Sequence, residues 1–380
     1  MDISAILDLT GDSGAAALVG LTVGAIFGVA SQRSRFCLRA ATVEFARGRL
    51  GPRMAVWLLC FSTAVFWTQA FTLLDLVPLQ QVRFLAQTGS ISGAILGGLI
   101  FGAGMVLARG CSGRLLVLSA SGNLRALLSG LVFAVTAQMS LYGVLAPARN
   151  ALAALWTTGP ANIELTAWLG LGPYAGLAIG ASLAVVALVV SRRAGIGWAV
   201  LVFGSGVGFS VGAGWLLTAL VAASSFDPVP IESLTFSGPS ADTLMYFMTA
   251  SESLDFDVGL IPGVFLGAAL AALLAGEWKL EGFEGARLVA LLELLYATGM
   301  RVSELVALPQ AAAARDPQVL TVRGKGDKER IVPLSEAARG ALKDYLAARA
   351  DILPKGKSSP WLFFSRSSSG HLTRHRVAQL

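Results

Sequence analysis

The stretch Ile91–Arg114 reads ISGAILGGLIFGAGMVLARGCSGR, and it decides the fold of the first two-thirds of the chain. It is apolar until its end, and its glycines recur at near-helical spacing, a pattern that lets two helix backbones approach closely in a bilayer. It closes on a thiol, Cys111, between two guanidinium groups, Arg109 and Arg114. Such groups are costly in lipid unless they face protein or a water-filled path. We therefore predict a site at the end of a membrane helix.

Composition and charge divide the chain in two. Its 380 residues are 55% hydrophobic and 14% charged, with a mean hydropathy of +0.68, whereas about a quarter of the residues of a soluble domain are charged. Residues 1–286 carry 14 basic and 15 acidic side chains, while residues 287–380 carry 15 basic and 8 acidic ones. We therefore expect a membrane-embedded unit and a basic, water-soluble unit with different partners.

The first unit contains about six or seven apolar segments that, with their flanks, are long enough to cross a bilayer. A short or half helix after Cys111 is expected to break near residues 121–123. The basic connection 33–53 is expected to be cytoplasmic under the positive-inside rule. The expected spans are Ala15–Ala30, Ala55–Leu74, Ile91–Leu107, Leu124–Leu145, Tyr174–Val190, Ile196–Val221 and Val258–Ala275.

A faint internal repetition links residues 21–45 with residues 201–219, since both have a glycine-rich helix leading to a polar or aromatic turn. Weak self-similarity with glycine-interrupted segments is typical of inverted-repeat transporters, although glycine-rich helices also resemble one another by composition. The three cysteines form no even framework and have no metal-ligand spacing. We therefore predict neither a disulfide scaffold nor a metal or other cofactor.

Four segments resemble the YeeE/YedE family of membrane proteins over roughly residues 15–285. They are SRFCLR (34–39), ARGCSGR (108–114), ESLTFSGPSADTL (232–244) and DVGLIPGVFLGAALAALLAGEWKLEGFEG (257–285). The resemblance implies inward transport of thiosulfate or related sulfur compounds, with cysteines at breaks between half-helices contacting the substrate. After residue 285 the family's second glycine-rich helix with its Gly-Cys turn does not follow, so we expect an incomplete second repeat.

Three side chains are the candidate substrate contacts: Cys111 first, Cys37 second, and Arg114. A thiol is a weak, soft donor suited to a terminal sulfur, and half-helix N-termini would offer backbone N–H groups to an anion. The alternative is that the cysteines are small packed residues. For Cys60, inside an apolar helix, packing is the expected role.

The basic segment after residue 286 has the pattern of a mixed α/β unit. A helix with apolar residues at a 3.6-residue period is predicted to break at Gly299 and to resume around Ser303. Two β-rich runs, VLTV and RIVPL, flank a GKGDK turn and predict a hairpin. Ser335 is the expected N-cap of the helix that follows.

Two motifs of this segment, ATGMRVSEL (297–305) and VRGKGDKERIVPL (322–334), resemble the catalytic domain of XerC/XerD-type tyrosine recombinases. The resemblance implies that Arg301 holds the scissile phosphate and Lys325 protonates the leaving oxygen. Lys328 and Arg330 are further candidate DNA contacts. The family's tyrosine nucleophile is missing, because the last tyrosine, Tyr345, lies in an amphipathic helix. Cleavage needs nucleophile, acid and phosphate clamps together, so we predict an inactive recombinase segment.

The sequence thus predicts an all-α polytopic membrane unit with broken helices over residues 1–285, and a partial recombinase-like α/β unit over residues 286–380. We expect a multi-pass protein of the bacterial inner (cytoplasmic) membrane with a cytoplasmic C-terminal segment. The expected partners are the bilayer and a sulfur-containing anion such as thiosulfate, with DNA at the basic tail. A sulfur-compound permease, a membrane-tethered DNA-binding protein and a non-functional fusion product remain open, as do a gene fusion, a deletion or an assembly join as the junction's origin.

Overall fold

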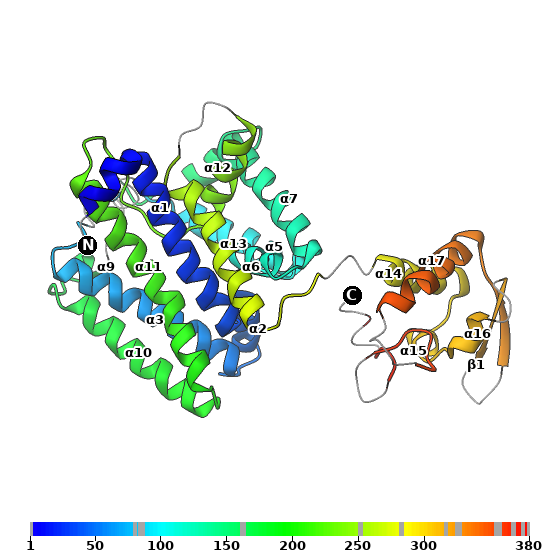
Figure 1. The fold of residues 1–380 in the computed structure, drawn as a ribbon. Helices are drawn as coiled ribbons and strands as arrows, with labels where there is room; N and C mark the ends of the chain where they lie inside the picture. Colours follow the sequence, from blue (N-terminus) through cyan, green and yellow to red (C-terminus); the bar gives the residue numbers. More distant parts are fainter. Residues whose placement is uncertain are drawn as a thin grey trace. The chain divides into compact units, whose positions relative to one another are not determined.

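The chain forms two compact units, Met1–Glu281 and Gly282–Leu380 (Figure 1). The computed structural model describes residues 3–78, 82, 88–159, 165–249, 254–280, 285–314, 318–323, 329–352, 359–365, 370–373 and 377.

Among the described residues of the first unit, every named element is a helix. Its helices are α1 (Ile3–Ser34), α2 (Leu38–Ala46), α3 (Pro52–Leu73), α5 (Ile91–Leu107), α6 (Ser112–Ala120), α7 (Leu124–Leu141), α8 (Ala146–Ala154), α9 (Leu165–Trp168), α10 (Ala175–Arg193), α11 (Trp198–Ser224), α12 (Ser237–Met248) and α13 (Phe256–Leu274).

Within the described residues, seven helical segments are long and apolar enough to cross a membrane. The all-α polytopic prediction is therefore confirmed, and the protein is a multi-pass membrane protein. The seven segments are Leu9–Ser34, Pro52–Leu73, Ile91–Ala120, Leu124–Leu141, Ala175–Arg193, Trp198–Ser224 and Phe256–Leu274.

Helices α1 and α13, far apart in sequence, pack together over their length at the centre of this unit (Figure 1). Each presents a row of glycines to the other, and a Cβ at any of these positions would collide with a carbonyl oxygen of the facing helix. Small residues allow this approach in a bilayer, where packing replaces the hydrophobic drive between helices. The glycines are Gly20, Gly24 and Gly28 on α1, and Gly259, Gly263 and Gly267 on α13.

Two short helices begin in the same way. Arg35 has a left-handed φ of 54°, and two residues later Cys37 is the N-cap of α2. Arg109 has a φ of 59°, and two residues later Cys111 is the N-cap of α6. The half helix expected after Cys111 is confirmed as α6. Besides the faint repetition noted in the sequence, the chain therefore repeats an Arg-x-Cys break before a nine-residue helix.

The segment after α13 is attached to the turn between α6 and α7. The backbone N–H of Lys279 donates to the carbonyl of Ser121 at 3.2 Å. Gly122, with a φ of 99°, lies so close that a Cβ there would collide with the Lys279 carbonyl. This attachment holds residues 276–279 beside the broken helix that ends in Cys111.

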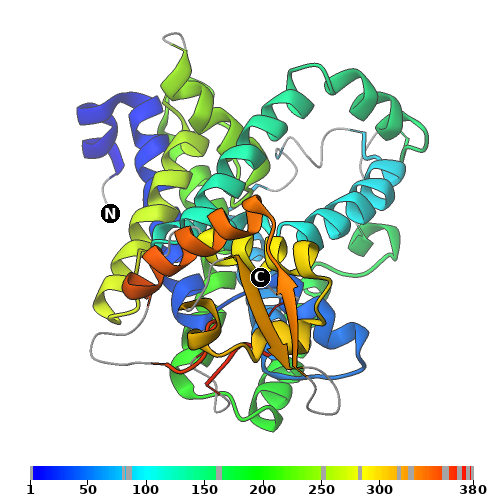
Figure 2. The ribbon, with the colours of Figure 1, turned by 90° about the vertical axis from the view of Figure 1, so that its right-hand side faces the viewer.

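The second unit contains the predicted hairpin and helices. Its elements are α14 (Gly285–Thr298), α15 (Val302–Val306), α16 (Gln310–Ala314), β1 (Val319–Arg323), β2 (Glu329–Pro333) and α17 (Glu336–Ile352). Strands β1 and β2 are antiparallel (Figure 2), with Thr321 opposite Ile331.

The predicted helix boundaries of this unit are confirmed as well. Helix α14 ends before Gly299, whose φ is 58°. The Ser335 hydroxyl accepts a hydrogen bond from the Ala338 N–H at 3.2 Å at the start of α17. The small mixed α/β unit expected here is therefore present, with the hairpin turn 324–328 outside the described residues.

Candidate functional site

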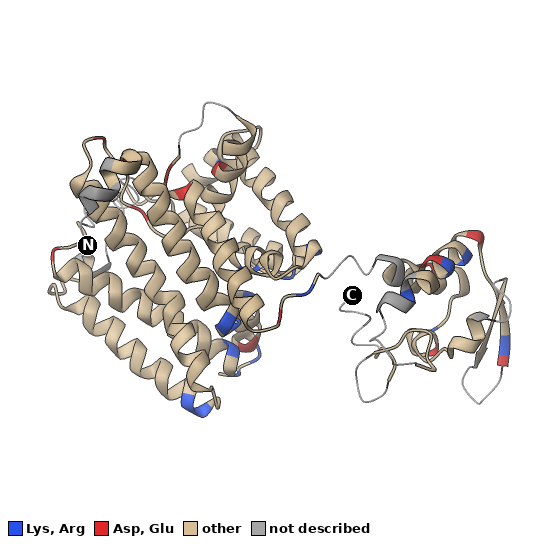
Figure 3. Ribbon diagram, viewed as in Figure 1, with Lys and Arg blue, Asp and Glu red and all other residues tan. Residues whose placement is uncertain are grey.

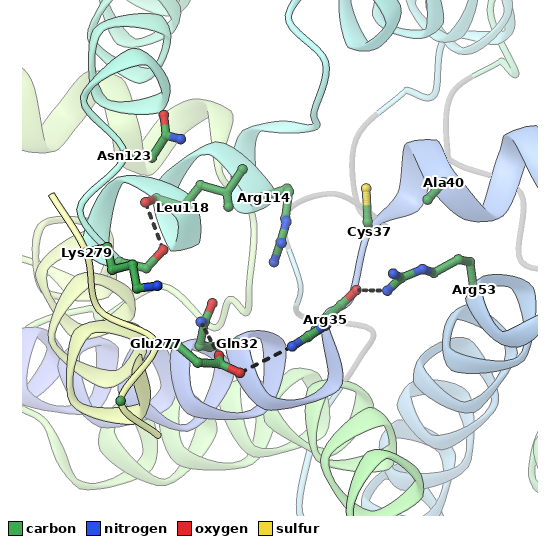
Figure 4. A pocket seen from close by; sticks show the side chains of 12 residues that line it. Gln32, Arg35, Cys37, Ala40, Arg53, Arg114, Leu118, Asn123, Glu277 and Lys279 are labelled. Carbon is green, nitrogen blue, oxygen red and sulfur yellow. Dashed lines mark hydrogen bonds and ion pairs between the residues drawn. The ribbon is translucent and has the colours of Figure 1, made fainter. Parts of the chain in front are cut away.

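A cavity of about 590 Å³ lies where the Arg35–Cys37 break and helix α6 meet the segment after α13 (Figure 4). Its volume is in the range of small-molecule sites. Five separate parts of the first unit line it: the end of α1 with the break and the first turn of α2, the start of α3, helix α6, the α6–α7 turn, and the segment after α13. The lining residues are Gln32, Arg35, Cys37, Ala40, Arg53, Arg114, Leu118, Ser121, Asn123, Gly276, Glu277 and Lys279.

The cavity lining is cationic. Four of its side chains carry a positive charge, and Glu277 alone among these twelve residues carries a negative one. Lys and Arg gather toward one end of this unit, while most Asp and Glu lie toward the other (Figure 3). A concave surface lined by one sign of charge concentrates the opposite ion, so the cavity is suited to an anion. The four cations are Arg35, Arg53, Arg114 and Lys279.

Arg114, on the first turn of α6, points into the cavity (Figure 4). Its Nη1 atom is buried and has no hydrogen-bond partner among the described residues. The guanidinium lies within electrostatic range of Cys37, Cys111 and the like charges of Arg53 and Arg35. A buried guanidinium N–H without an acceptor costs free energy, and a bound anion would remove that cost.

The two N-cap cysteines lie near Arg114 at different depths. Cys37 is half-buried and lines the cavity, whereas Cys111 is only 9% exposed and lies behind the lining. The backbone amides of Arg114 and Leu38 both face the Cys111 thiol, so this sulfur lies at the starts of α6 and α2 at once. Neither helix start has a side-chain cap hydrogen bond. The structure thus brings together the three predicted contacts, Cys111, Cys37 and Arg114.

Cys60 lies apart from this site. It is inside α3, partly buried against the apolar cluster that includes Val207 and Phe27. Its surroundings are those of a packed apolar residue. Within the described residues, no group of three or more His, Cys, Asp or Glu side chains is placed to hold a metal ion.

One carboxylate occupies the cationic lining. Glu277 accepts a hydrogen bond from Gln32 Nε2 at 3.2 Å and forms an ion pair with Arg35 Nη2 at 3.2 Å (Figure 4). Arg53 Nη1 donates to the Arg35 carbonyl oxygen at 3.3 Å, which links the start of α3 to the same break. Sequence reasoning did not select Gln32, Glu277 or Lys279 as site residues. The repeated Arg-x-Cys pattern was a signal that could have selected Arg35.

In the second unit, two of the predicted DNA contacts share one carboxylate. Glu304 pairs with Arg301 Nη1 at 3.5 Å and with Arg330 Nη2 at 3.0 Å. The Arg301 side chain is 72% exposed. Lys325 and Lys328 lie outside the described residues.

The last tyrosine of the chain has a structural partner. Tyr345 is fully buried, its hydroxyl donates to the Leu362 carbonyl at 2.8 Å, and its ring stacks on Phe363. A hydroxyl held in this way in the core is not presented to a DNA strand.

Comparison with known proteins separates the same two parts. Residues 278–379 match the phage integrase family. The tyrosine recombinase XerD of Caulobacter vibrioides is 51% identical over 121 residues, which cover 32% of this chain and 40% of that protein. XerD of Bradyrhizobium diazoefficiens is 58% identical over 97 residues, covering 24% of this chain and 30% of that protein.

A third relative, the tyrosine recombinase XerC of Erythrobacter litoralis, is 49% identical over 94 residues, covering 25% of this chain and 28% of that protein. The chain therefore spans well under half the length of these curated relatives. The larger match, to the family described as sulphur transport, covers residues 33–292. Since this match includes most of the chain and most of its membrane unit, the protein belongs to the sulphur transport family and carries a phage-integrase-like segment fused to it.

Proposed function

We propose that the membrane unit binds a small sulfur-containing oxyanion such as thiosulfate in the cationic cavity and carries it inward across the bacterial cytoplasmic membrane. The observation that carries this proposal is the buried Arg114 Nη1, which has no hydrogen-bond partner in the described part of the chain. It lies beside two helix starts at which the N-cap residue is a cysteine that makes no cap hydrogen bond. Family membership supports a sulfur compound as the substrate class.

The chemistry of the three contacts suits such an anion. Arg114 would donate charge-assisted hydrogen bonds to the oxyanion oxygens. The uncapped N-termini of α2 and α6 add backbone N–H groups and the positive ends of two helix dipoles. Cys111 and Cys37 offer weak, soft S–H donors, which suit a polarisable terminal sulfur.

The distribution of basic residues supports an orientation in which the cavity lies at the cytoplasmic side of the membrane. The basic residues of the α2–α3 connection and of the end of α10 lie at the end of the unit where the cavity is lined. Short basic connections stay on the cytoplasmic side of a membrane. We place the cavity at the cytoplasmic side, and with it the segment after α13 and the second unit that follows.

Uptake of radiolabelled thiosulfate tests this function in a bacterial host that lacks its own sulfate and thiosulfate uptake systems. The full chain should support uptake and growth on thiosulfate as sole sulfur source. The variants Cys111→Ala and Arg114→Gln should abolish uptake at equal protein levels, while the matched variant Cys60→Ala should retain it. Equal uptake with and without the intact gene would reject the proposal.

A second function is DNA binding by the C-terminal unit. It is favoured by the joint placement of Arg301 and Arg330 around Glu304 and by the similarity to XerD over this segment. The phosphate backbone supplies most of the affinity of such basic surfaces, so binding should weaken steeply with salt. Strand cleavage is not part of the proposal, because the Tyr345 hydroxyl is buried in the core. Fluorescence anisotropy of labelled duplex DNA with the detergent-solubilised chain tests it, and no binding even at low salt would reject it.

A further inference from the structure

The cavity contains a carboxylate bound in the way that a substrate oxyanion would be bound. Glu277 takes one N–H from the amide of Gln32 and one from the guanidinium of Arg35, both at 3.2 Å. The Gln32 side chain is held at an otherwise buried position, 8% exposed. An amide and a guanidinium converging on two oxygens of one carboxylate would serve equally for two oxygens of a sulfur oxyanion.

The Glu277 contact is weak enough to exchange. Its ion pair with Arg35 is partly solvated, with the side chains 64% and 38% exposed. Solvent-exposed ion pairs contribute little net stability. The chain that carries Glu277 stays fixed through the backbone bond from Lys279 to Ser121, so the carboxylate can leave its position by side-chain rotation without unfolding the segment.

We propose that Gln32 and Arg35 form an outer anion-binding station at the cavity, and that the Glu277 carboxylate occupies this station until a substrate oxyanion displaces it. The station is distinct from the inner contacts. Arg114 lies on α6 across the cavity (Figure 4), and Cys111, the N-cap residue of α6, is not one of the lining residues. This inference rests on the proposed function for the nature of the displacing anion. The occupancy by Glu277 is a property of the cavity itself and can be tested without a transported substrate.

The first test uses Cys37, which lines the same cavity, as a reporter of its charge. Replacing Cys60 and Cys111 by alanine in the full chain leaves Cys37 as the single thiol. Its rates of modification by anionic sulfonatoethyl methanethiosulfonate and by cationic trimethylammonioethyl methanethiosulfonate are then compared. Glu277→Gln should raise the anionic-to-cationic rate ratio roughly fivefold, the effect of one unit charge across a partly hydrated cavity.

The matched control is Asp75→Asn. It removes one negative charge from an exposed side chain just beyond α3, at the opposite end of that helix from Arg53, and a left-handed residue with a φ of 54° tolerates asparagine. The control should leave the rate ratio unchanged. An unchanged ratio in Glu277→Gln, or an equal change in Asp75→Asn, would overturn the station.

The second test measures thiosulfate binding by calorimetry on the detergent-solubilised chain with all three cysteines present. Removing the competing carboxylate in Glu277→Gln should tighten binding severalfold, and Arg35→Gln should weaken it. If Glu277→Gln changes the rate ratio but thiosulfate binds neither the parent protein nor the Glu277→Gln variant, the station is supported and the proposed substrate is wrong. If thiosulfate binds the parent protein and the Glu277→Gln variant equally, and the modification-rate ratio is unchanged, the proposed function stands and the station is overturned.

Discussion

Arg35 and Arg109 have the same left-handed backbone conformation, with φ of 54° and 59°, each two residues before a cysteine at the N-cap position of a short helix. A left-handed residue other than glycine, asparagine or aspartate is uncommon, and such strain persists where the surroundings impose it. Here each strained residue ends a long apolar helix and turns the chain so that a cysteine begins the next one. The two breaks together supply both thiols of the site and two helix starts that have no side-chain cap hydrogen bond.

We predict that Arg109→Gly leaves the protein more stable than Arg109→Ala does. Both variants lose the guanidinium, but only glycine adopts the left-handed conformation without steric cost, which amounts to about 1 kcal/mol. Thermal unfolding of the detergent-solubilised variants measures the difference. At a helical position such as Arg125 on α7, the order should reverse, with alanine more stable than glycine. Equal stability of the two variants at position 109 would show that the left-handed backbone conformation there imposes no steric cost on alanine.

The membrane spans could be predicted because apolar length alone specifies them. The third segment was expected to end at Leu107 and to be followed by a half helix, and α5 and α6 have these bounds because polar and glycine residues break the apolar run. The hairpin of the second unit could also be predicted from local sequence, because β-rich runs flank its turn.

The composition of the cavity could not be predicted in the same way. Glu277 lies 242 residues after its partner Arg35, and nothing in the local pattern around either residue specifies the pair. The contact follows from the packing of α1 on α13 through their facing glycines and from the attachment of Lys279 to Ser121. Periodicity predicts that a helix exists, but not which helix will pack against it.

We predict that Gly24→Val prevents close packing of α1 on α13. A side chain at Gly24 would meet the Leu260 carbonyl and the backbone of Gly263, and overpacking of this kind costs roughly 1–3 kcal/mol. The melting temperature should fall, with loss of monodisperse protein in size-exclusion chromatography. Gly98→Val on α5 is the matched control, because among the described residues a Cβ there would meet nothing within 4 Å beyond the adjoining backbone of its own helix. A fall in both variants would instead indicate a general intolerance of valine at glycine positions in this unit.

We predict that Arg330→Gln weakens DNA binding about equally for all sequences. The guanidinium is half exposed beside Glu304 and Arg301, which suits a phosphate contact rather than a base contact. The slope of log K against log salt should fall in magnitude by about 0.9, the value for one phosphate contact. Lys343→Gln, at an exposed position on α17, serves as the control with one charge less. An identical loss in the control would show that net charge alone determines binding.

We predict that Arg349→Met destabilises the second unit more than Tyr345→Phe does. Arg349 is 6% exposed and donates to the carbonyls of Leu362, Ser359 and Trp361 at 3.0 to 3.3 Å. Methionine fills a similar length but leaves these carbonyls without the guanidinium. In Tyr345→Phe, the Leu362 carbonyl keeps its bond from Arg349, so the cost should be near the value for one neutral hydrogen bond, about 1 kcal/mol.

Hydrogen–deuterium exchange on the full chain compares the destabilisation by the two variants. It is read at the Leu362 amide, which donates to the Leu308 carbonyl at 2.8 Å. Exchange there should be faster in Tyr345→Phe than in the parent chain, and faster still in Arg349→Met. Tyr296→Phe, at a side chain that is 91% exposed, should leave it unchanged. Faster exchange in Tyr345→Phe than in Arg349→Met would mean that the tyrosine, rather than the buried arginine, holds the segment 359–365 against α17.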